Sequence, residues 1–204
     1  MWTYLILGGG IGLSAALQPG PLQAFYFAKV AEQGWKRTLP AAFAPLISDG
    51  PIILVSLLLL RRVPEHFQTW LQLGGGFLLL YYAWSTFRSW QTPPEENHAR
   101  SSSAPKTVLQ AALINLLNPN PYLGWSLVMG PALLSAWSEQ PVYLVGLLLT
   151  FYALLIGISL LIIILLGTTN LLAEEKKQGL LLISSLVLAG LGLYTLTTGL
   201  LAVV

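Results

Sequence analysis

The residue in this sequence best suited to chemistry is Asp49, a carboxylate near the centre of a long apolar stretch. A charge at the centre of a membrane helix costs at least ~2.5 kcal/mol, so Asp49 should face a bundle interior and have a partner. No Lys or Arg lies in a comparable stretch, which leaves a proton, a cation or a substrate ammonium as its counter-charge. A buried carboxyl group can also take up and release protons. The simpler alternative is a protonated aspartate hydrogen-bonded to a neighbouring helix.

Two proline pairs interrupt two other apolar stretches, as Pro19-Gly20-Pro21 and Pro119-Asn120-Pro121. Proline inside a helix removes a backbone donor and clashes with the carbonyl four residues earlier, so each pair should unwind a turn. Freed backbone groups cost several kcal/mol in hydrocarbon, so the breaks should face the bundle interior or a wet cavity. Half-helix ends at that depth can bind a carboxylate or an ion. The alternative is a pair of kinks that only shape packing.

Amide side chains flank both breaks: Gln18 and Gln23 at the first, and Asn115, Asn118 and Asn120 at the second. Asn115 and Asn118 are three residues apart and should share a helix face. Each amide is a candidate ligand for a polar substrate, with hydrogen bonding between helices as the alternative.

The candidate substrate- or ion-binding set follows from these features. It comprises Asp49, Gln18, Pro19, Gly20, Pro21, Gln23, Asn115, Asn118, Pro119, Asn120 and Pro121. Four aromatic residues near the same level, Tyr26, Tyr81, Trp125 and Tyr152, could wall a cavity, but we expect each to pack in the core or face lipid.

The composition indicates an integral membrane protein. Of the 204 residues 55% are hydrophobic and 9% charged, against about 25% charged in a soluble domain. A net charge of +2 does not favour nucleic-acid binding, and cysteine is absent. His66 and His98 both lie in polar connections, and no GxxxxGK[ST] loop occurs. We therefore expect no cofactor, no metal site and no enzymatic activity.

Six windows are long and apolar enough to cross a bilayer, which needs about 20 residues per helix. They are residues 4–28, 39–60, 67–89, 108–134, 142–166 and 179–203. The first is expected to be a retained span, because no basic segment precedes it. We predict an all-α membrane domain over 1–204, made of a three-helix repeat at 1–90, a linker at 91–107 and a second repeat at 108–204.

The basic residues predict the orientation, since short cytoplasmic loops are rich in Lys and Arg. The first, third and fifth connections and the helix ends beside them hold eight of them, namely Lys29, Lys36, Arg37, Arg88, Arg100, Lys106, Lys176 and Lys177. The second holds Arg61 and Arg62, and the fourth holds none. Both termini should therefore lie outside, with the linker in the cytoplasm.

The two halves resemble each other. An offset of 100 residues aligns the two proline pairs, and the third and sixth windows share glycines followed by a tyrosine. Because each half holds three spans, the second must enter from the opposite side, which is the pattern of an inverted-repeat transporter.

These motifs resemble those of the lysine exporter (LysE/RhtB) family of amino-acid efflux proteins over essentially the whole chain. The similarity is carried by Gln18-Pro19-Gly20-Pro21, by Asp49, and by Asn115-Leu116-Leu117-Asn118-Pro119. The family often continues with Lys-Ala after that Asn-Pro, where this chain has Asn120-Pro121, a second proline and no cation. The resemblance implies proton-coupled export of amino acids or related small metabolites across a prokaryotic inner membrane.

Two alternatives stay open. One is an inorganic-cation exporter of the same fold class, against which stand the single intramembrane acid and the lack of intramembrane histidine. The other is a non-transporting membrane scaffold or receptor, which would not need the polar residues at mid-membrane depth. Glycine-rich spans also permit a homodimer.

Overall fold

A computed structural model of the chain describes residues 1–59, 65–91, 104–168 and 174–201, and over these residues it contains helices and no strands. The helices are α1 (Trp2–Leu17), α2 (Pro21–Gln33), α3 (Trp35–Thr38), η1 (Leu39–Phe43), α4 (Ala44–Leu59), α5 (Glu65–Gln91), α6 (Ala104–Leu116), α7 (Pro119–Gly124), η2 (Trp125–Met129), α8 (Gly130–Glu139), α9 (Pro141–Thr168) and α10 (Glu174–Leu201). Of the short elements, η1 is a 3-10 turn and η2 is a π-helical turn.

Within the described part of the chain, three helical stretches are long and apolar enough to cross a membrane: Trp35–Ser56, Pro141–Thr168 and Gln178–Leu201. The bent pair α1–α2 meets the same test if it counts as one span. The protein is therefore a multi-pass, all-helical membrane protein. The other two expected spans correspond to α5 and to the broken α6–α8 segment, and remain predictions.

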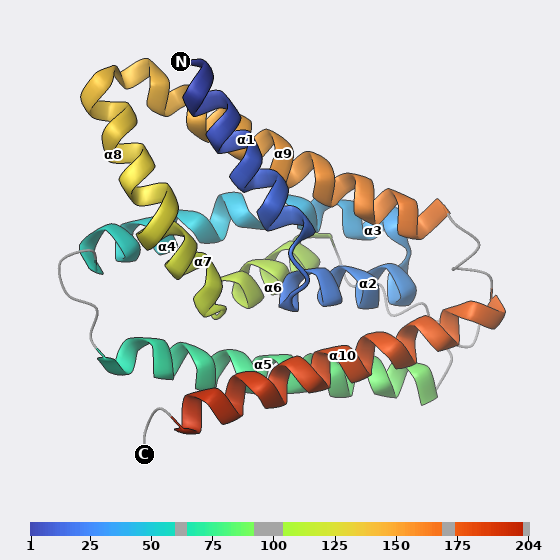
Figure 1. Ribbon diagram of the computed structural model, residues 1–204. Coiled ribbons are helices and arrows are strands. Elements are labelled where there is room, and N and C mark those ends of the chain that lie inside the picture. Colours follow the sequence, from blue (N-terminus) through green and yellow to red (C-terminus); the bar gives the residue numbers. More distant parts are fainter. Residues whose placement is uncertain (60–64, 92–103, 169–173, 202–204) are drawn as a thin grey trace.

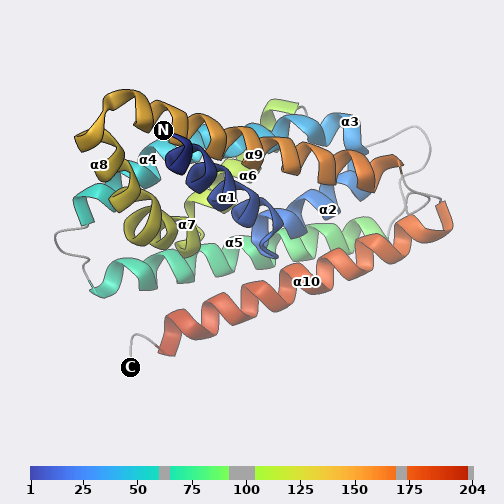
Figure 2. The same cartoon turned by 45° about the horizontal axis from the view of Figure 1, so that its top comes forward.

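The long helices pack as pairs (Figures 1 and 2). α5 and α10 lie side by side and antiparallel, and α1 lies along α9, with the shorter α2, α6 and α7 between the pairs. Glycines allow the close approach: a Cβ added at Gly8 or Gly12 would collide with the carbonyl oxygens of Leu147 or Phe151 in α9. At such contacts small residues let two backbones approach closely, which strengthens helix packing in lipid.

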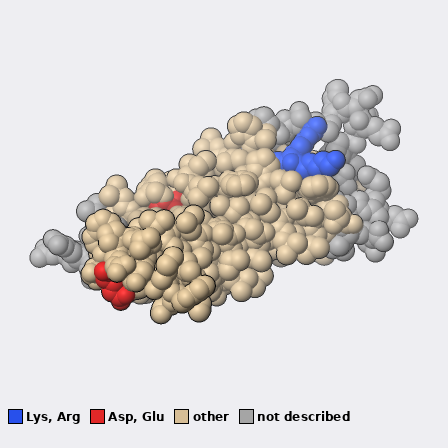
Figure 3. Space-filling view, turned by 90° about the horizontal axis from the view of Figure 1, so that it is seen from above, with Lys and Arg blue, Asp and Glu red and all other residues tan. Residues whose placement is uncertain are grey.

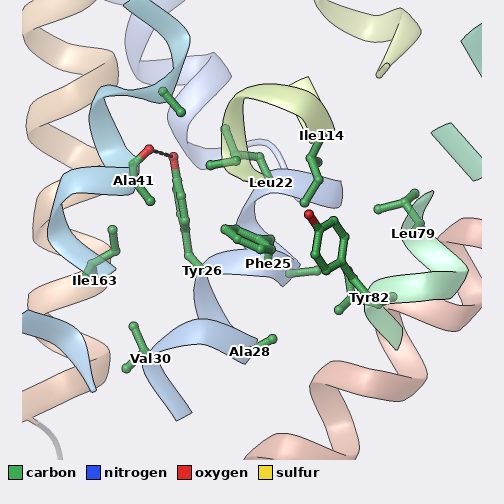
Figure 4. Close-up of a cluster of buried hydrophobic side chains, with 14 of the residues drawn as sticks. Leu22, Phe25, Tyr26, Ala28, Val30, Ala41, Leu79, Tyr82, Ile114 and Ile163 are labelled. Atoms are coloured by element: carbon green, nitrogen blue, oxygen red, sulfur yellow. Dashed lines mark hydrogen bonds between the residues drawn. The ribbon is translucent and has the colours of Figure 1, made fainter. Parts of the chain in front are cut away.

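One core cluster surrounds α2, which is buried on most of its surface (Figure 4). The Phe25 and Tyr82 rings meet edge to face with centroids 5.4 Å apart, and the Tyr26 hydroxyl donates to the Ala41 carbonyl oxygen at 3.3 Å. α2 is therefore an internal half-helix, held by α5, α6, α9 and α10.

The expected connection at 29–38 is wrong. α2 continues to Gln33, the chain turns at Gly34 with a φ of 84°, and α3 begins at once at Trp35. Glycine suits this turn because it adopts positive φ without steric cost. Lys29 is not a loop residue but lies buried in α2, 8% exposed. The expected connections at 61–66 and 167–178 fall mostly on residues outside the described ranges, or on residues of which only the backbone is described. Residues 92–103 of the expected linker also lie outside those ranges.

The side chains that the structure describes put few charges on the surface. On the face shown in Figure 3, Lys and Arg gather at one end, acidic residues appear near the other, and the wide area between carries neither. Exposed apolar side chains such as Ile6, Trp70, Leu149 and Leu193 lie on the long helices, as expected for a lipid-facing surface.

Candidate functional site

The first break separates α1 from α2 by residues 18–20, and the two helices meet at an angle of 57°. The break frees carbonyl groups at the end of α1. The Gln23 side chain meets this need, because its Nε2 donates to the Ala16 carbonyl at 3.1 Å and to the Ala15 carbonyl at 3.4 Å. One amide, two residues into α2, thus stabilises the end of α1.

The second break separates α6 from α7 by Leu117 and Asn118, and its backbone groups are satisfied in a similar way. The Tyr122 hydroxyl donates to the Leu116 carbonyl at 2.9 Å. The Asn118 side chain caps α7 by accepting from the Asn120 backbone N–H at 3.1 Å. At both breaks, therefore, a carbonyl group at the end of the first half-helix accepts a hydrogen bond from a side chain of the second half-helix.

The prolines act differently from the expectation. Pro21 and Pro119 are the first residues of α2 and α7, where a missing N–H costs nothing, and Pro121 lies inside α7. Only Pro19 lies in a break itself. The second break is shorter than a full turn, and the expectation of an unwound turn there is wrong.

Asp49 lies in α4, 3% exposed, and receives hydrogen bonds from two other elements. Asn115 Nδ2 of α6 donates to Oδ1 at 3.0 Å, and the Tyr152 hydroxyl of α9 donates to Oδ2 at 3.2 Å. The Trp125 side chain of η2 also lies beside the carboxyl group. Asn115 Nδ2 also donates to Ser48 Oγ at 2.8 Å. All these donors are neutral, and within the described ranges Asp49 forms no ion pair.

Residues of both breaks and Asp49 line one cavity of about 240 Å³. Nine members of the candidate set line it: Gln18, Pro19, Gly20, Gln23, Asp49, Asn115, Asn118, Asn120 and Pro121. Pro21 and Pro119 line a smaller cavity of about 20 Å³ instead. The expectation that Asn115 and Asn118 share a helix face is wrong, since α6 ends at Leu116 and Asn118 is extended, yet both reach the cavity.

The remaining cavity wall is mostly apolar, with Ile11, Met129, Phe151 and Leu155 among its residues. Asp49 is the one charged residue among those that line it. The exposed lining residues are Ser14 at the end of α1, Gln18 and Pro19 in the first break, and Asn120 and Gly124 in α7. They mark the mouth of the cavity, on the side of α1 and α7.

The expectation that the four aromatic residues only pack in the core or face lipid is wrong for two of them, Trp125 and Tyr152. Trp125 lines the cavity, and Tyr152 bonds to Asp49. Phe151 connects them, with ring centroids 5.4 Å from Trp125 and 4.9 Å from Tyr152. Trp125 begins the π-helical turn, a feature that often marks functional sites in helices. A local signal in the sequence is Pro131, which follows the turn and lacks the backbone N–H that regular helical bonding needs.

A second polar cluster lies at the C-terminal end of α2, away from the cavity. Lys29 Nζ pairs with Glu32 Oε2 at 2.6 Å and stands 5.6 Å from the Phe25 ring centroid. The Thr86 hydroxyl of α5 donates to Glu32 Oε1 at 3.0 Å. Gln33 Nε2 donates to Thr107 Oγ1 of α6 at 3.0 Å. Glu32 is thus an acid inside the candidate broken span Trp2–Gln33, beyond the end expected at residue 28, and it is neutralised by Lys29.

Comparison with known protein families matches residues 13–199 to the LysE type translocators. The chain belongs to the LysE type translocator family. Members are efflux transporters of amino acids or other small molecules and not enzymes, which confirms the resemblance and the expectation of no enzymatic activity. Comparisons with curated proteins and with solved structures gave no match.

Proposed function

We propose that this translocator exports amino acids or related small metabolites in exchange for protons, with the cavity between the two breaks as the substrate site. The carrying observation is Asp49, a buried carboxylate that faces a cavity and is held by neutral donors only. A buried charge without a counter-charge is costly, so a proton or a cationic group from outside the protein should complete the site.

The other candidate residues would serve the same site in two ways. Gln18, Asn118 and Asn120 line the cavity near its mouth and can bond to polar substrate groups. Gln23, Pro19, Gly20, Pro21, Pro119 and Pro121 shape the breaks, and Asn115 orients Asp49. The start of α2, with its partial positive charge, suits a substrate carboxylate beside the cavity.

We further propose that the chain is one domain of six spans built as two inverted repeats, 1–90 and 108–204, joined by the linker 91–107. The contact between α5 and α10, the third and sixth spans, supports a twofold axis. A Cβ at Gly76 would lie 3.0 Å from the Gly192 carbonyl oxygen, and a Cβ at Gly192 would lie 3.1 Å from that of Gly76. Each glycine also meets the leucine four residues after the other, Leu196 or Leu80, so the contact is self-complementary.

Alternating access would then open the two ends of the cavity in turn. The mouth beside α1 and α7 is one end. At the other, the core around α2 and the Lys29–Glu32–Thr86 and Gln33–Thr107 contacts join α2 to α5 and α6. Opening this end should require these contacts to break.

For the setting, we propose a prokaryotic inner membrane with both termini outside and the linker in the cytoplasm. With Lys29 placed inside α2, the basic residues of the connections and helix ends still divide seven to two (eight less one, against two) in favour of this orientation. A homodimer is compatible with the exposed apolar helix faces.

An inorganic-cation exporter is the second candidate and is less well supported. Among the residues that the structure describes, no three His, Cys, Asp or Glu side chains gather where a metal could bind. A scaffold or receptor would not need the buried carboxylate at a cavity.

Reconstitution tests the proposal. Purified protein in proteoliposomes should accumulate or release radiolabelled amino acids when a pH gradient is imposed, and a protonophore should abolish the effect. Transport that ignores the pH gradient would reject proton coupling, and a full panel without transport would favour a receptor or scaffold.

A further inference from the structure

The charge inventory of the cavity restricts its ligands, and the argument rests on the proposed transport role. Twenty residues line the cavity, and the single charged group among them is the Asp49 carboxylate. The groups packed against that carboxylate are neutral at physiological pH: Ser48 on its own helix, Asn115 on α6, Trp125 on η2 and Tyr152 on α9. Of these, Tyr152 alone can titrate.

We infer that the cavity takes compounds with one ammonium group and a compact apolar body, and that this ammonium and the coupling proton occupy Asp49 in turn. Asp49 is then both the specificity-determining residue and the point of exchange.

The single ammonium follows from charge balance. One ammonium neutralises Asp49, and the carboxylate of an amino acid would lie at the partial positive charge of the α2 start, beside Gly20 and Leu22. A second ammonium, at the far end of a side chain, would lie against walls such as Phe151, Leu155 and Met129 with no opposite charge beside it. A compound with a carboxylate and no ammonium would instead add a negative charge beside Asp49. Both arrangements leave a buried charge unpaired, which is strongly unfavourable.

The compact apolar body of the ligand is inferred from the apolar wall and the small volume of the cavity. At about 240 Å³ the cavity is smaller than the ~300–1,000 Å³ typical of sites for drug-sized ligands, so its occupant is a small metabolite. Burial of apolar side-chain atoms against Ile11, Phe151 and Leu155 would supply binding free energy of ~25 cal/mol per Å².

The ammonium and the proton must occupy Asp49 in turn, because Asp49 is the one carboxylate that lines the cavity. When Asp49 is protonated it carries no charge to attract an ammonium. Binding of the ammonium to the protonated form must therefore release the carboxyl proton to water, one proton for each ammonium bound. Proton and substrate then compete, and their exchange across the membrane has a ratio of one to one.

The test is a binding study on the full-length protein in lipid nanodiscs with four probes of similar size. Leucine and leucinamide have one ammonium, 4-methylpentanoate has none, and lysine has a second. Leucine and leucinamide should bind, and the other two should bind at least about tenfold more weakly. In the pH range where Asp49 is protonated, the Kd should rise about tenfold per unit fall in pH. Calorimetry in buffers of different ionisation enthalpy should show one proton released per ligand.

Two variants complete the experiment. Asp49→Asn should lose proton release and the pH dependence of Kd. Glu139→Gln should keep both, because Glu139 is an exposed acid that bonds to Tyr4 outside the cavity. Lysine binding as tight as leucine, or no binding by either single-ammonium probe, would overturn the ligand class. A Kd independent of pH would overturn the shared site. Either result leaves gradient-driven transport in proteoliposomes standing, whereas failure of the proposed function would appear as no transport of any compound.

Discussion

The Asn115 amide offers a quantitative test of the contact between α4 and α6. It is 7% exposed and donates to both Ser48 and Asp49. Asn115→Leu removes both bonds while keeping a side chain of similar size. A hydrogen bond contributes about 0.5–1.5 kcal/mol between neutral groups and about 1.5–3 kcal/mol to a charged one. In membrane proteins the measured mean is nearer ~0.6 kcal/mol.

The partners decide where in this range the loss falls. Ser48 also bonds to the Ala44 carbonyl at 3.2 Å, so the loss there is small, whereas Asp49 loses one of its few donors. We expect the free energy of unfolding to fall by about 1–3 kcal/mol. The assay is reversible unfolding in mixed micelles, followed by tryptophan fluorescence.

A matched control lies on the same helix. The Gln110 side-chain oxygen is buried without a hydrogen-bond partner, so Gln110→Leu should lower stability less than Asn115→Leu or raise it. If the two variants unfold alike, or if Asn115→Leu equals the native protein, the reasoning about this contact is refuted.

Three further predictions concern packing, the second polar cluster and topology. Gly75→Ala should destabilise the protein, because its Cβ would lie 2.5 Å from a backbone carbonyl oxygen of the second break, while Gly10→Ala, with nothing within 4 Å, should be neutral in the same unfolding assay. Glu32→Gln should lower the free energy of unfolding by about 1–3 kcal/mol by leaving the Lys29 ammonium unpaired, less than the ~3–5 kcal/mol of a fully buried pair because the side chains are 10% and 14% exposed. Neutralising Lys29 as well should recover part of the loss. Single cysteines at Thr3 and Ser102 should label differently with an impermeant thiol reagent added outside cells; labelling at Ser102 alone would invert the orientation.

Much of the fold could be predicted because the signals are local. Apolar windows long enough for a helix to cross a bilayer indicate the long helices, and two proline pairs indicate where two of them break. The ends of the helices were less predictable. Lys29 suggested a loop because a lone lysine is costly in a membrane, and its neutralising partner Glu32 became apparent only with helical geometry.

The candidate site was predicted in part for a related reason. Polar residues at mid-membrane depth are rare, so Asp49 and the amides stand out in the sequence. Trp125 and Tyr152 do not, because aromatic residues are common in membrane helices, and only the fold brings them to Asp49. Nor could the sequence show that Gln23 and Tyr122 would hold the free carbonyls at the two breaks.

The central claim is that Asp49 at the cavity couples transport to protons, and its most direct test is gradient-driven transport by Asp49→Asn in proteoliposomes. The asparagine is nearly the same size, so the variant should express and fold as the native protein does. We predict that Asp49→Asn loses transport driven by a pH gradient, while Glu139→Gln, an acid-to-amide change outside the cavity, retains it. Native rates of gradient-driven transport in folded Asp49→Asn would contradict the account.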